Sequence, residues 1–352
     1  MTQKMKKFNV IIYAPNIKVG GGLILLKELI GKVPKSLNVF CILNEEVKEN
    51  FPDQPMYTVS SSIFGRIKAE LLVRRLSHQA KSVFCFHGVP TLLKTHCKQS
   101  VYIQNALLVD SSTKKNYSLF SRLRLYVESN LIKFKLHNMA YCYVQTRSME
   151  ERLRQFCKKN HMHTPKILIA PFIPTLGNSK QPLSSKKDID FIYPADAQPH
   201  KNLRNLFLAW QILAEDNIRP SLVVTLDDQS FKTLKKTISF DEMKVNIINL
   251  GMMRYEDLKK VYQRSCALIF PSFLESFGLP LIEASQMGLQ ILASEKNFVY
   301  DVCSPSDTFD PHSAKSIAVA VKKFKGITTK SRISCVEKDF WKTFMSKEKV
   351  EH

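Results

Sequence analysis

One segment of the chain, from Ala267 to Cys303, constrains the fold more than any other part. It opens with four apolar residues, which predict a buried strand, and this strand breaks at Pro271-Ser272. A loop carrying Glu275 follows. A helix is predicted from Pro280 to near Gly288, because proline favours the first turn and glycine the position just past the end. The next apolar run, Leu289 to Ala293, predicts another strand. Strand, loop, helix and strand in this order predict a parallel α/β crossover.

The same alternation extends over both halves of the chain. With 352 residues, the protein exceeds what one hydrophobic core usually serves, so two domains are expected. Residues 173–188 interrupt the pattern with proline, glycine and serine, which is typical of a linker. Strands are predicted on either side of it, at Asn9–Ala14, Leu37–Leu43, Ser82–Phe86, Ser100–Ile103, Ala140–Val144 and Lys166–Ile169, and at Ile189–Tyr193, Ser221–Leu226, Val245–Asn249, Cys266–Phe270 and Leu289–Ala293. We therefore predict an α/β protein with one parallel sheet in each half.

The loop and helix of the first segment contain two glutamates with seven residues between them. The stretch reads Glu275-Ser-Phe277-Gly278-Leu279-Pro-Leu-Ile-Glu283, and it resembles the donor-sugar motif of retaining glycosyltransferases of family 4, the glycosyl transferases group 1. The resemblance implies the GT-B fold, with two doubly wound Rossmann-like domains facing across a cleft. Residues 1–172 would bind the acceptor and residues 189–335 the nucleotide-sugar donor, with a last helix in 336–352 returning to the first domain. The structural alternative is a helix cap beside a surface glutamate.

The resemblance also implies roles for these residues in moving a sugar from a nucleoside-diphosphate sugar to an acceptor hydroxyl. Glu275 would bind donor-sugar hydroxyls, and the backbone at Phe277, Gly278 and Leu279 would support the sugar or the phosphates. Glu283 would accept both ribose hydroxyls, a task suited to a carboxylate. These glutamates would bind the donor and would not form a glycosidase acid–base pair.

Lys201 follows the strand Ile189–Tyr193 in the run Pro-His-Lys-Asn. A lysine at this place in such transferases stabilises the charge that develops on the departing diphosphate. The alternative is a solvated lysine at a helix start, where a cation is unfavourable. Many relatives also carry an arginine where this chain has Asp196, and Arg204 is a candidate replacement.

Further candidate site residues lie at other strand ends. Gly20, Gly21 and Gly22 follow the first strand and are predicted to form a loop against the donor phosphate, with a tight turn as the alternative. His87 is a candidate catalytic group, although a histidine after a buried strand is often structural. The sequence offers three candidate cleft residues, Asn105, Asn202 and Ser272.

We expect neither a metal nor a cofactor. The nucleoside-diphosphate sugar would be a substrate. The pair Asp188 and Asp190 opens a strand, and Asp227-Asp228 is predicted to form a turn. A nucleotide-sugar epimerase or dehydrogenase is disfavoured, because Leu23-Ile24-Leu25 breaks the Gly-x-Gly-x-x-Gly fingerprint. By resemblance, the acceptor would be a saccharide linked to polyprenyl diphosphate, as in the biosynthesis of lipopolysaccharide O-antigen or capsule.

The net charge of +21 is unevenly distributed. Residues 1–172 hold 27 Lys and Arg against 10 Asp and Glu, whereas residues 173–352 hold 25 against 21. No nucleic-acid-binding motif accompanies this charge. Between Ser111 and Asn138 the cations alternate with apolar residues, and Glu128 is the only acid. We therefore expect a cytoplasmic protein bound peripherally to the inner face of the cell membrane through anionic lipids. Two alternatives remain: a solvated face of core helices, or a basic nucleic-acid- or membrane-binding α/β protein without transferase activity.

Overall fold

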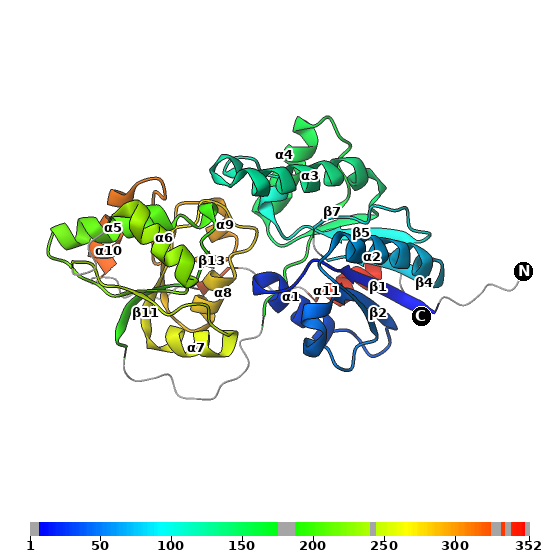
Figure 1. Ribbon diagram of the computed structural model, residues 1–352, viewed down its shortest axis with the longest axis horizontal. Coiled ribbons are helices and arrows are strands. Elements are labelled where there is room, and N and C mark those ends of the chain that lie inside the picture. Colours follow the sequence, from blue (N-terminus) through cyan, green and yellow to red (C-terminus); the bar gives the residue numbers. More distant parts are fainter. Residues whose placement is uncertain are drawn as a thin grey trace, which may run out of the picture. The chain divides into compact units, whose positions relative to one another are not determined.

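The computed structural model describes residues 7–86, 88–174, 187–239, 244–324, 332–334 and 339–348. Contacts divide the chain into two compact units, Met1–Pro174 with Val336–His352, and Thr175–Cys335 (Figure 1). Most of the predicted linker and the start of the predicted last helix lie outside the described residues. Within the described ranges, none of the helices is long and apolar enough to cross a membrane.

The first unit contains a seven-stranded parallel sheet in the order β3-β2-β1-β4-β5-β6-β7. Its strands are β1 (Phe8–Ala14), β2 (Val39–Asn44), β3 (Met56–Val59), β4 (Ala80–Cys85), β5 (Lys98–Tyr102), β6 (Tyr141–Val144) and β7 (Ile167–Ile169). Its helices are α1 (Gly20–Gly31), α2 (Ile63–Leu76), α3 (Leu119–Lys135), α4 (Arg147–Lys159) and α11 (Phe340–Glu348), with 3-10 turns η1 (Glu45–Asn50), η2 (Ser77–Gln79), η3 (Ala106–Leu108), η4 (Lys114–Asn116) and η5 (Leu136–Asn138). Because parallel crossovers are right-handed, α1 lies on one face of the sheet and α2, α3 and α4 lie on the other.

The last helix, α11, packs on the first unit, where the sequence analysis expects it. The indole of Trp341 donates a hydrogen bond of 2.8 Å to the carbonyl oxygen of Leu29 in α1. The rings of Phe340 and Phe344 each lie 5.1 Å from the ring of Phe84 in β4. The end of the chain therefore completes the hydrophobic core on the α1 face of this sheet.

The second unit contains a six-stranded parallel sheet in the order β10-β9-β8-β11-β12-β14. Its strands are β8 (Ile189–Tyr193), β9 (Leu222–Val224), β10 (Ile247–Asn249), β11 (Ser265–Phe270), β12 (Gln290–Ser294) and β14 (Asp307–Phe309), and β13 (Cys303–Ser304) pairs separately with β15 (Arg332–Ile333). Its helices are α5 (Leu203–Glu215), α6 (Asp228–Ile238), α7 (Tyr255–Arg264), α8 (Leu279–Gln286), α9 (Asn297–Tyr300) and α10 (Ala314–Lys323), and the 3-10 turn η6 spans Pro199–Lys201.

Both sheets reverse their strand order at one position, which sets the place of the site. The reversal falls between β1 and β4 in the first unit and between β8 and β11 in the second. Ligands of open α/β sheets bind outside the carboxyl ends of the strands at such a switch point. Two predicted details are wrong. Asp227 does not form a turn but caps α6, since its carboxylate accepts from the backbone of Ser230 at 2.9 Å. The predicted glycine loop begins α1, as described below.

Candidate functional site

Lys201 and Glu275 form a buried ion pair at the switch point of the second sheet. Lys201 ends the turn after β8, and Glu275 lies in the loop after the neighbouring strand β11. Lys201 Nζ donates to Glu275 Oε1 at 2.7 Å, and the two side chains are only 17% and 9% exposed. The structure thus brings together two residues that are 74 positions apart in the sequence.

The loop carrying Lys201 is held by hydrogen bonds to the loop that precedes Glu275. The hydroxyl of Tyr193 bonds the carbonyl of Lys201 and the hydroxyl of Ser272, each at 2.9 Å. The backbone N–H of Phe273 donates to the carbonyl of His200 at 2.8 Å. These contacts fix the ammonium of Lys201 relative to both loops, as a preorganised electrostatic site requires.

Two of the candidate cleft residues have a structural role instead. Asn202 is in the left-handed conformation with a φ of 59°, which asparagine tolerates better than most residues. Its buried amide donates to the carbonyls of Pro271 and Pro311, at 3.0 and 2.7 Å, and so joins three strand ends. Ser272 is fully buried beneath the loop. Neither side chain presents its polar group to an open surface.

The charges of the pair are mutually stabilised. Burial works to raise the pKa of Glu275, but the Lys201 charge and hydrogen bonds outweigh it and hold that pKa below its usual value. Burial likewise works to lower the pKa of Lys201, and Glu275 outweighs it and raises that pKa. Burial lowers the pKa of the neighbouring His200. At neutral pH the site therefore holds a fixed ammonium beside a fixed carboxylate.

Glu283 lies on α8, which begins directly after the Glu275 loop. Gly278 precedes the helix with a φ of 78°, and a Cβ there would come within 3.0 Å of a Leu281 methyl group, so glycine is needed at this turn. Glu283 is 4% exposed, and its carboxylate accepts from the hydroxyl of Tyr262 at 2.8 Å. Burial raises the pKa of Glu283 to about 7, against the opposing effect of tyrosine hydrogen bonds. This carboxyl therefore titrates near neutral pH.

The remaining motif residues line the same region to different degrees. Phe277 is buried at 2% exposure, whereas Leu279 is half-buried at the start of α8. Within the described ranges, no three His, Cys, Asp or Glu side chains come together in a group that could hold a metal ion.

The predicted glycine loop of the first unit is the first turn of a helix. We expected Gly20, Gly21 and Gly22 in a loop before the helix, but α1 begins at Gly20, which has a φ of 69°. The first helical N–H groups have no partner within a helix, so this turn still offers donors to an anion. A Cβ on Gly22 would lie 3.9 Å from Gln104, whose amide donates to the carbonyl of Phe86 at the end of the β4 region. These residues mark the switch point of the first sheet.

Two other predicted residues of the first unit have different outcomes. Asn105 caps η3, since its side chain accepts from the backbone N–H of Leu107 at 3.0 Å. This capping role occupies the side-chain oxygen of Asn105 and leaves the residue half-buried. His87 lies outside the described residues, so its catalytic role stays a prediction.

Comparison with known proteins identifies the second unit. Residues 177–336 match the family model described as glycosyl transferases group 1. This part of the chain is a group 1 glycosyltransferase domain. The Lys201–Glu275 pair and Glu283 all lie within it. Its family is the one that the motif from Glu275 to Glu283 resembles.

Two curated relatives of the group 1 domain are named O-antigen chain mannosyltransferases. The chain is 26% identical over 137 residues to O-antigen chain mannosyltransferase B of Escherichia coli, covering 37% of this chain and 35% of the relative. It is 24% identical over 141 residues to O-antigen chain mannosyltransferase RfbU of Salmonella typhimurium, covering 40% and 39%. The alignments thus span little more than a third of either relative.

Solved structures extend the likeness to both units. The chain matches Anabaena HepE, crystallised with UDP and glucose, with a TM-score of 0.63 and 12% identity, over 90% of this chain and 89% of the other. At this identity the match shows the fold alone. The protein has the GT-B fold with two Rossmann-like domains, as the sequence analysis predicted.

Sequence reasoning missed the tyrosines that position the charged groups. Tyr193 is the last residue of β8 and Tyr262 lies on α7, and both are fully buried with their hydroxyls bonded at the site. A tyrosine at the end of a strand that leads into a site is a usable signal, because a buried phenol needs a hydrogen-bond partner. No such signal exists for Tyr262, whose partner is set by the packing of α7 on α8.

Proposed function

We propose that the protein is a retaining glycosyltransferase that moves a sugar from a nucleoside-diphosphate sugar to a saccharide hydroxyl. The buried Lys201–Glu275 pair at the switch point of the group 1 domain carries this proposal. The curated relatives are mannosyltransferases by name, and the structure of Anabaena HepE contains UDP and glucose. These names favour a nucleotide-sugar donor. Retention of configuration rests on the resemblance to family 4.

In the proposed reaction, the bond between the anomeric carbon and the diphosphate oxygen breaks, and the acceptor oxygen bonds to that carbon. The proton of the acceptor hydroxyl passes to the departing diphosphate. The departing diphosphate gains negative charge, and Lys201 provides a cation fixed in a largely buried site, where such stabilisation is strongest. Glu275 would accept hydrogen bonds from sugar hydroxyls, and Glu283 from the ribose. We assign no nucleophile, and we propose that neither a metal nor a further cofactor takes part.

The test is a donor screen. The purified protein is incubated with UDP- and GDP-linked sugars, including those of mannose and glucose, with and without a chelator, and release of the nucleoside diphosphate is measured. We expect slow hydrolysis of one donor and no effect of the chelator. A folded protein that neither binds nor hydrolyses any nucleotide sugar would contradict the proposal.

We predict that nucleotide affinity depends on the titration of Glu283. The ionised carboxyl accepts ribose hydroxyls, and its pKa is raised to about 7. Affinity for the preferred nucleoside diphosphate should therefore rise about tenfold between pH 6 and pH 8 in calorimetry. In Glu283→Gln this component should vanish, while titration of the nucleotide itself persists in both proteins. Identical pH profiles for the two proteins would remove Glu283 from the site.

The raised pKa of Glu283 also affects the stability of the fold. Stability should fall as the pH rises, whereas nucleotide affinity should increase. Because the folded-state pKa of Glu283 exceeds its usual value, the folded state binds a proton more tightly than the unfolded state. The contribution of this group to stability therefore falls as the pH rises from about 4.5 to about 7. Glu283→Gln should remove this slope from the pH dependence of the free energy of unfolding.

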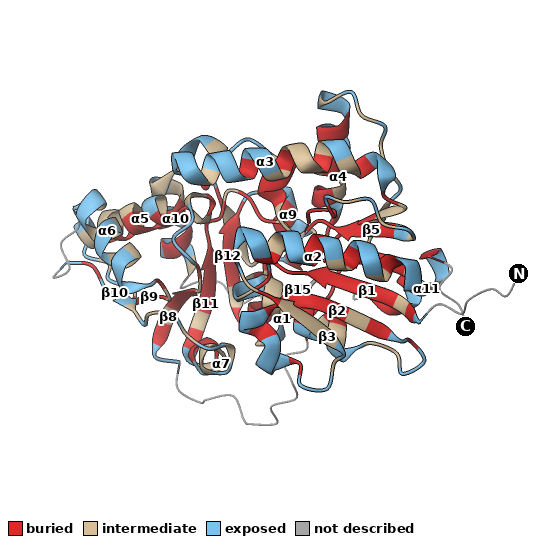
Figure 2. Ribbon diagram, turned by 45° about the vertical axis from the view of Figure 1, so that its right-hand side comes forward, coloured by how far each residue is buried: buried red, intermediate tan, exposed pale blue. Residues whose placement is uncertain are grey.

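We also propose that the acceptor is a saccharide linked to polyprenyl diphosphate in surface-polysaccharide assembly, and that the first unit binds the inner face of the cell membrane. Support comes from α2 and α3, which are close enough for their charges to interact. Burial raises the pKa of Glu128 on α3, and the charge of Arg66 on α2 opposes this shift. Both helices carry many exposed residues (Figure 2). These exposed residues include cations and large apolar side chains. The exposed apolar residues are Ile63, Phe64, Ile67, Leu71, Leu119, Phe120, Leu123, Tyr126, Val127 and Phe134.

The apolar residues of α3 lie on two faces of the helix, one buried in the core and one exposed. Leu125 and Ile132 belong to the stretch from Ser111 to Asn138 that we expected to face the membrane, but they are buried in the core at 1% and 0% exposure. Phe120 and Phe134, in contrast, are 80% and 71% exposed. A solvated face alone explains the cations but not these exposed rings, because soluble surfaces rarely expose large contiguous apolar patches.

We predict that the protein floats with anionic liposomes and that salt releases it, since each cation near such a surface contributes about 1 kcal/mol. Phe64→Ser with Phe120→Ser should reduce the bound fraction several-fold. The matched control changes two exposed apolar residues of the second unit, Met252→Ser with Val319→Ser, and should leave binding unchanged. Flotation that is absent, or equal in the two double variants, would leave only the solvated-face interpretation.

A further inference from the structure

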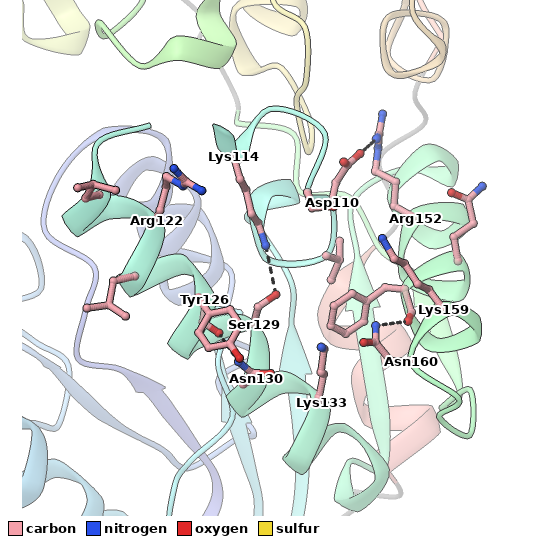
Figure 3. A pocket seen from close by; sticks show the side chains of 16 residues that line it. Asp110, Lys114, Arg122, Tyr126, Ser129, Asn130, Lys133, Arg152, Lys159 and Asn160 are labelled. Atoms are coloured by element: carbon pink, nitrogen blue, oxygen red, sulfur yellow. Dashed lines mark hydrogen bonds and ion pairs between the residues drawn. The ribbon is translucent and has the colours of Figure 1, made fainter. Parts of the chain in front are cut away.

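A pocket of about 720 Å³ lies in the first unit, apart from the group 1 domain. It is enclosed by the segment after η3, by α3 and by α4 (Figure 3). Its volume is in the range of sites that hold small organic ligands. None of the residues assigned to the proposed donor site lines it.

The pocket is strongly basic. Five cations line it, namely Lys114, Arg122, Lys133, Arg152 and Lys159, and Asp110 is the single carboxylate among its lining residues. Asp110 pairs with Arg152. In the part of the chain that the structure describes, the other four cations form no ion pair with an acid. The pocket therefore holds an excess of positive charge.

Lys114 and Lys133 both line the pocket, and their positive charges repel each other. The ammonium of Lys114 donates to the hydroxyl of Ser129 at 3.3 Å and is half-buried (Figure 3). Burial lowers the pKa of Lys114, and repulsion by Lys133 lowers it further, against the attraction of Asp110. Lys133 lies over the ring of Phe156 at 5.9 Å. An anion bound between these two ammonium groups would relieve their repulsion.

Arg152 lies on the opposite wall of the pocket, where its guanidinium pairs with Asp110. This pairing neutralises Asp110, so the carboxylate does not offset the charge of the two lysines. Phosphate oxygens are the acceptors that arginine and lysine bind together most readily.

The mouth of the pocket is apolar. Leu119, Leu123 and Tyr126 line it and are 80%, 61% and 65% exposed. All three belong to the α3 face proposed above to meet the membrane. A ligand that satisfies both parts of the site needs an anionic group for the interior and a hydrocarbon chain for the mouth.

We propose that this pocket binds the phosphate or diphosphate group of an amphiphile whose hydrocarbon chain lies along Leu119, Leu123 and Tyr126. Lys114 binds the phosphate oxygens from η4, and Lys133 binds them from α3. Resting on the proposed function, this ligand is the carrier part of the acceptor, so the pocket fixes the carrier while its saccharide extends away.

The test uses farnesyl diphosphate below its micellar concentration as the probe, in calorimetry with the full chain. Inorganic diphosphate and farnesol supply the two halves of the probe separately. We expect farnesyl diphosphate to bind at least tenfold more tightly than either half. Lys114→Gln with Lys133→Gln should weaken it at least tenfold, because two charge-assisted contacts are lost. The matched control, Lys35→Gln with Lys48→Gln, makes the same charge change at exposed positions outside the pocket and should bind as the unchanged protein does.

Three outcomes overturn the proposal: equal affinity in the two double variants, equal affinity for inorganic diphosphate, or equal affinity for farnesol. Hydrolysis of the nucleotide sugar is measured on the same preparations and should be unaffected by either double variant, which also shows that they are folded. If hydrolysis is present and probe binding is absent, the pocket proposal fails while the proposed function stands. If the probe binds and no donor is hydrolysed, the proposed function fails instead.

Discussion

Lys201→Ala should lower turnover by a factor of about 10² to 10³, the typical effect of removing one preorganised group that stabilises transition-state charge. The ammonium is held in place by Glu275 at 2.7 Å and by the Tyr193 hydroxyl on its own backbone carbonyl. Lys201 is thus the ammonium that pairs with the buried carboxylate of Glu275. Donor hydrolysis under saturating nucleotide sugar measures the effect, and Lys232→Ala, an exposed lysine on α6, is the matched control.

The same substitution leaves Glu275 buried without its partner, which costs about 3–5 kcal/mol when a buried pair is broken. Loss of activity could then reflect loss of folding. Lys201→Ala with Glu275→Gln removes both charges, so it should recover most of the stability while turnover stays low. If the double variant recovers turnover together with stability, Lys201 has only a structural role.

The charged pair could be predicted from the sequence because few facts determine it. Parallel strands end at the same edge, and the residues that follow β8 and β11 therefore meet at the switch point. The hydrogen bonds that hold the pair could not be predicted. The amide of Asn202 reaches Pro271 and Pro311 only because the loops after β11 and β14 fold over η6.

Some short strands and helix boundaries also could not be predicted from the sequence. We did not predict β3 or β14, since Met56–Val59 is mostly half-buried and Asp307–Phe309 is polar at its start. Neither segment has the apolar run that identified the central strands. The predicted start of α1 was wrong. Glycine favours loops in general, but here Gly20 has a positive φ and is the first residue of the helix. In α3, the apolar residues divide between two faces that only the packing distinguishes.

Removal of residues 336–352 should destabilise the first unit to the point of unfolding near room temperature. The helix α11 contributes three aromatic side chains, Phe340, Trp341 and Phe344, which are 3%, 2% and 0% exposed. Loss of a single buried aromatic side chain typically costs 3–5 kcal/mol. Three such losses approach the entire stability of an ordinary domain, about 5–15 kcal/mol. Thermal unfolding followed by circular dichroism, with the chain ending at Cys335, measures this effect.

Single substitutions in α11 test whether its buried aromatic side chains, rather than the segment as a whole, stabilise the first unit. Phe344 contacts Phe84 and Tyr143 at ring distances of 5.1 and 5.8 Å, so Phe344→Ala should lower the free energy of unfolding by about 3–5 kcal/mol. Lys347→Ala, on the exposed side of the same helix, should change it by less than about 0.5 kcal/mol. The proposed nucleotide site lies within the group 1 domain, so Phe344→Ala should retain nucleotide binding while the first unit loses stability. Unchanged unfolding of the truncated chain would mean that α11 only covers a core that is stable without it.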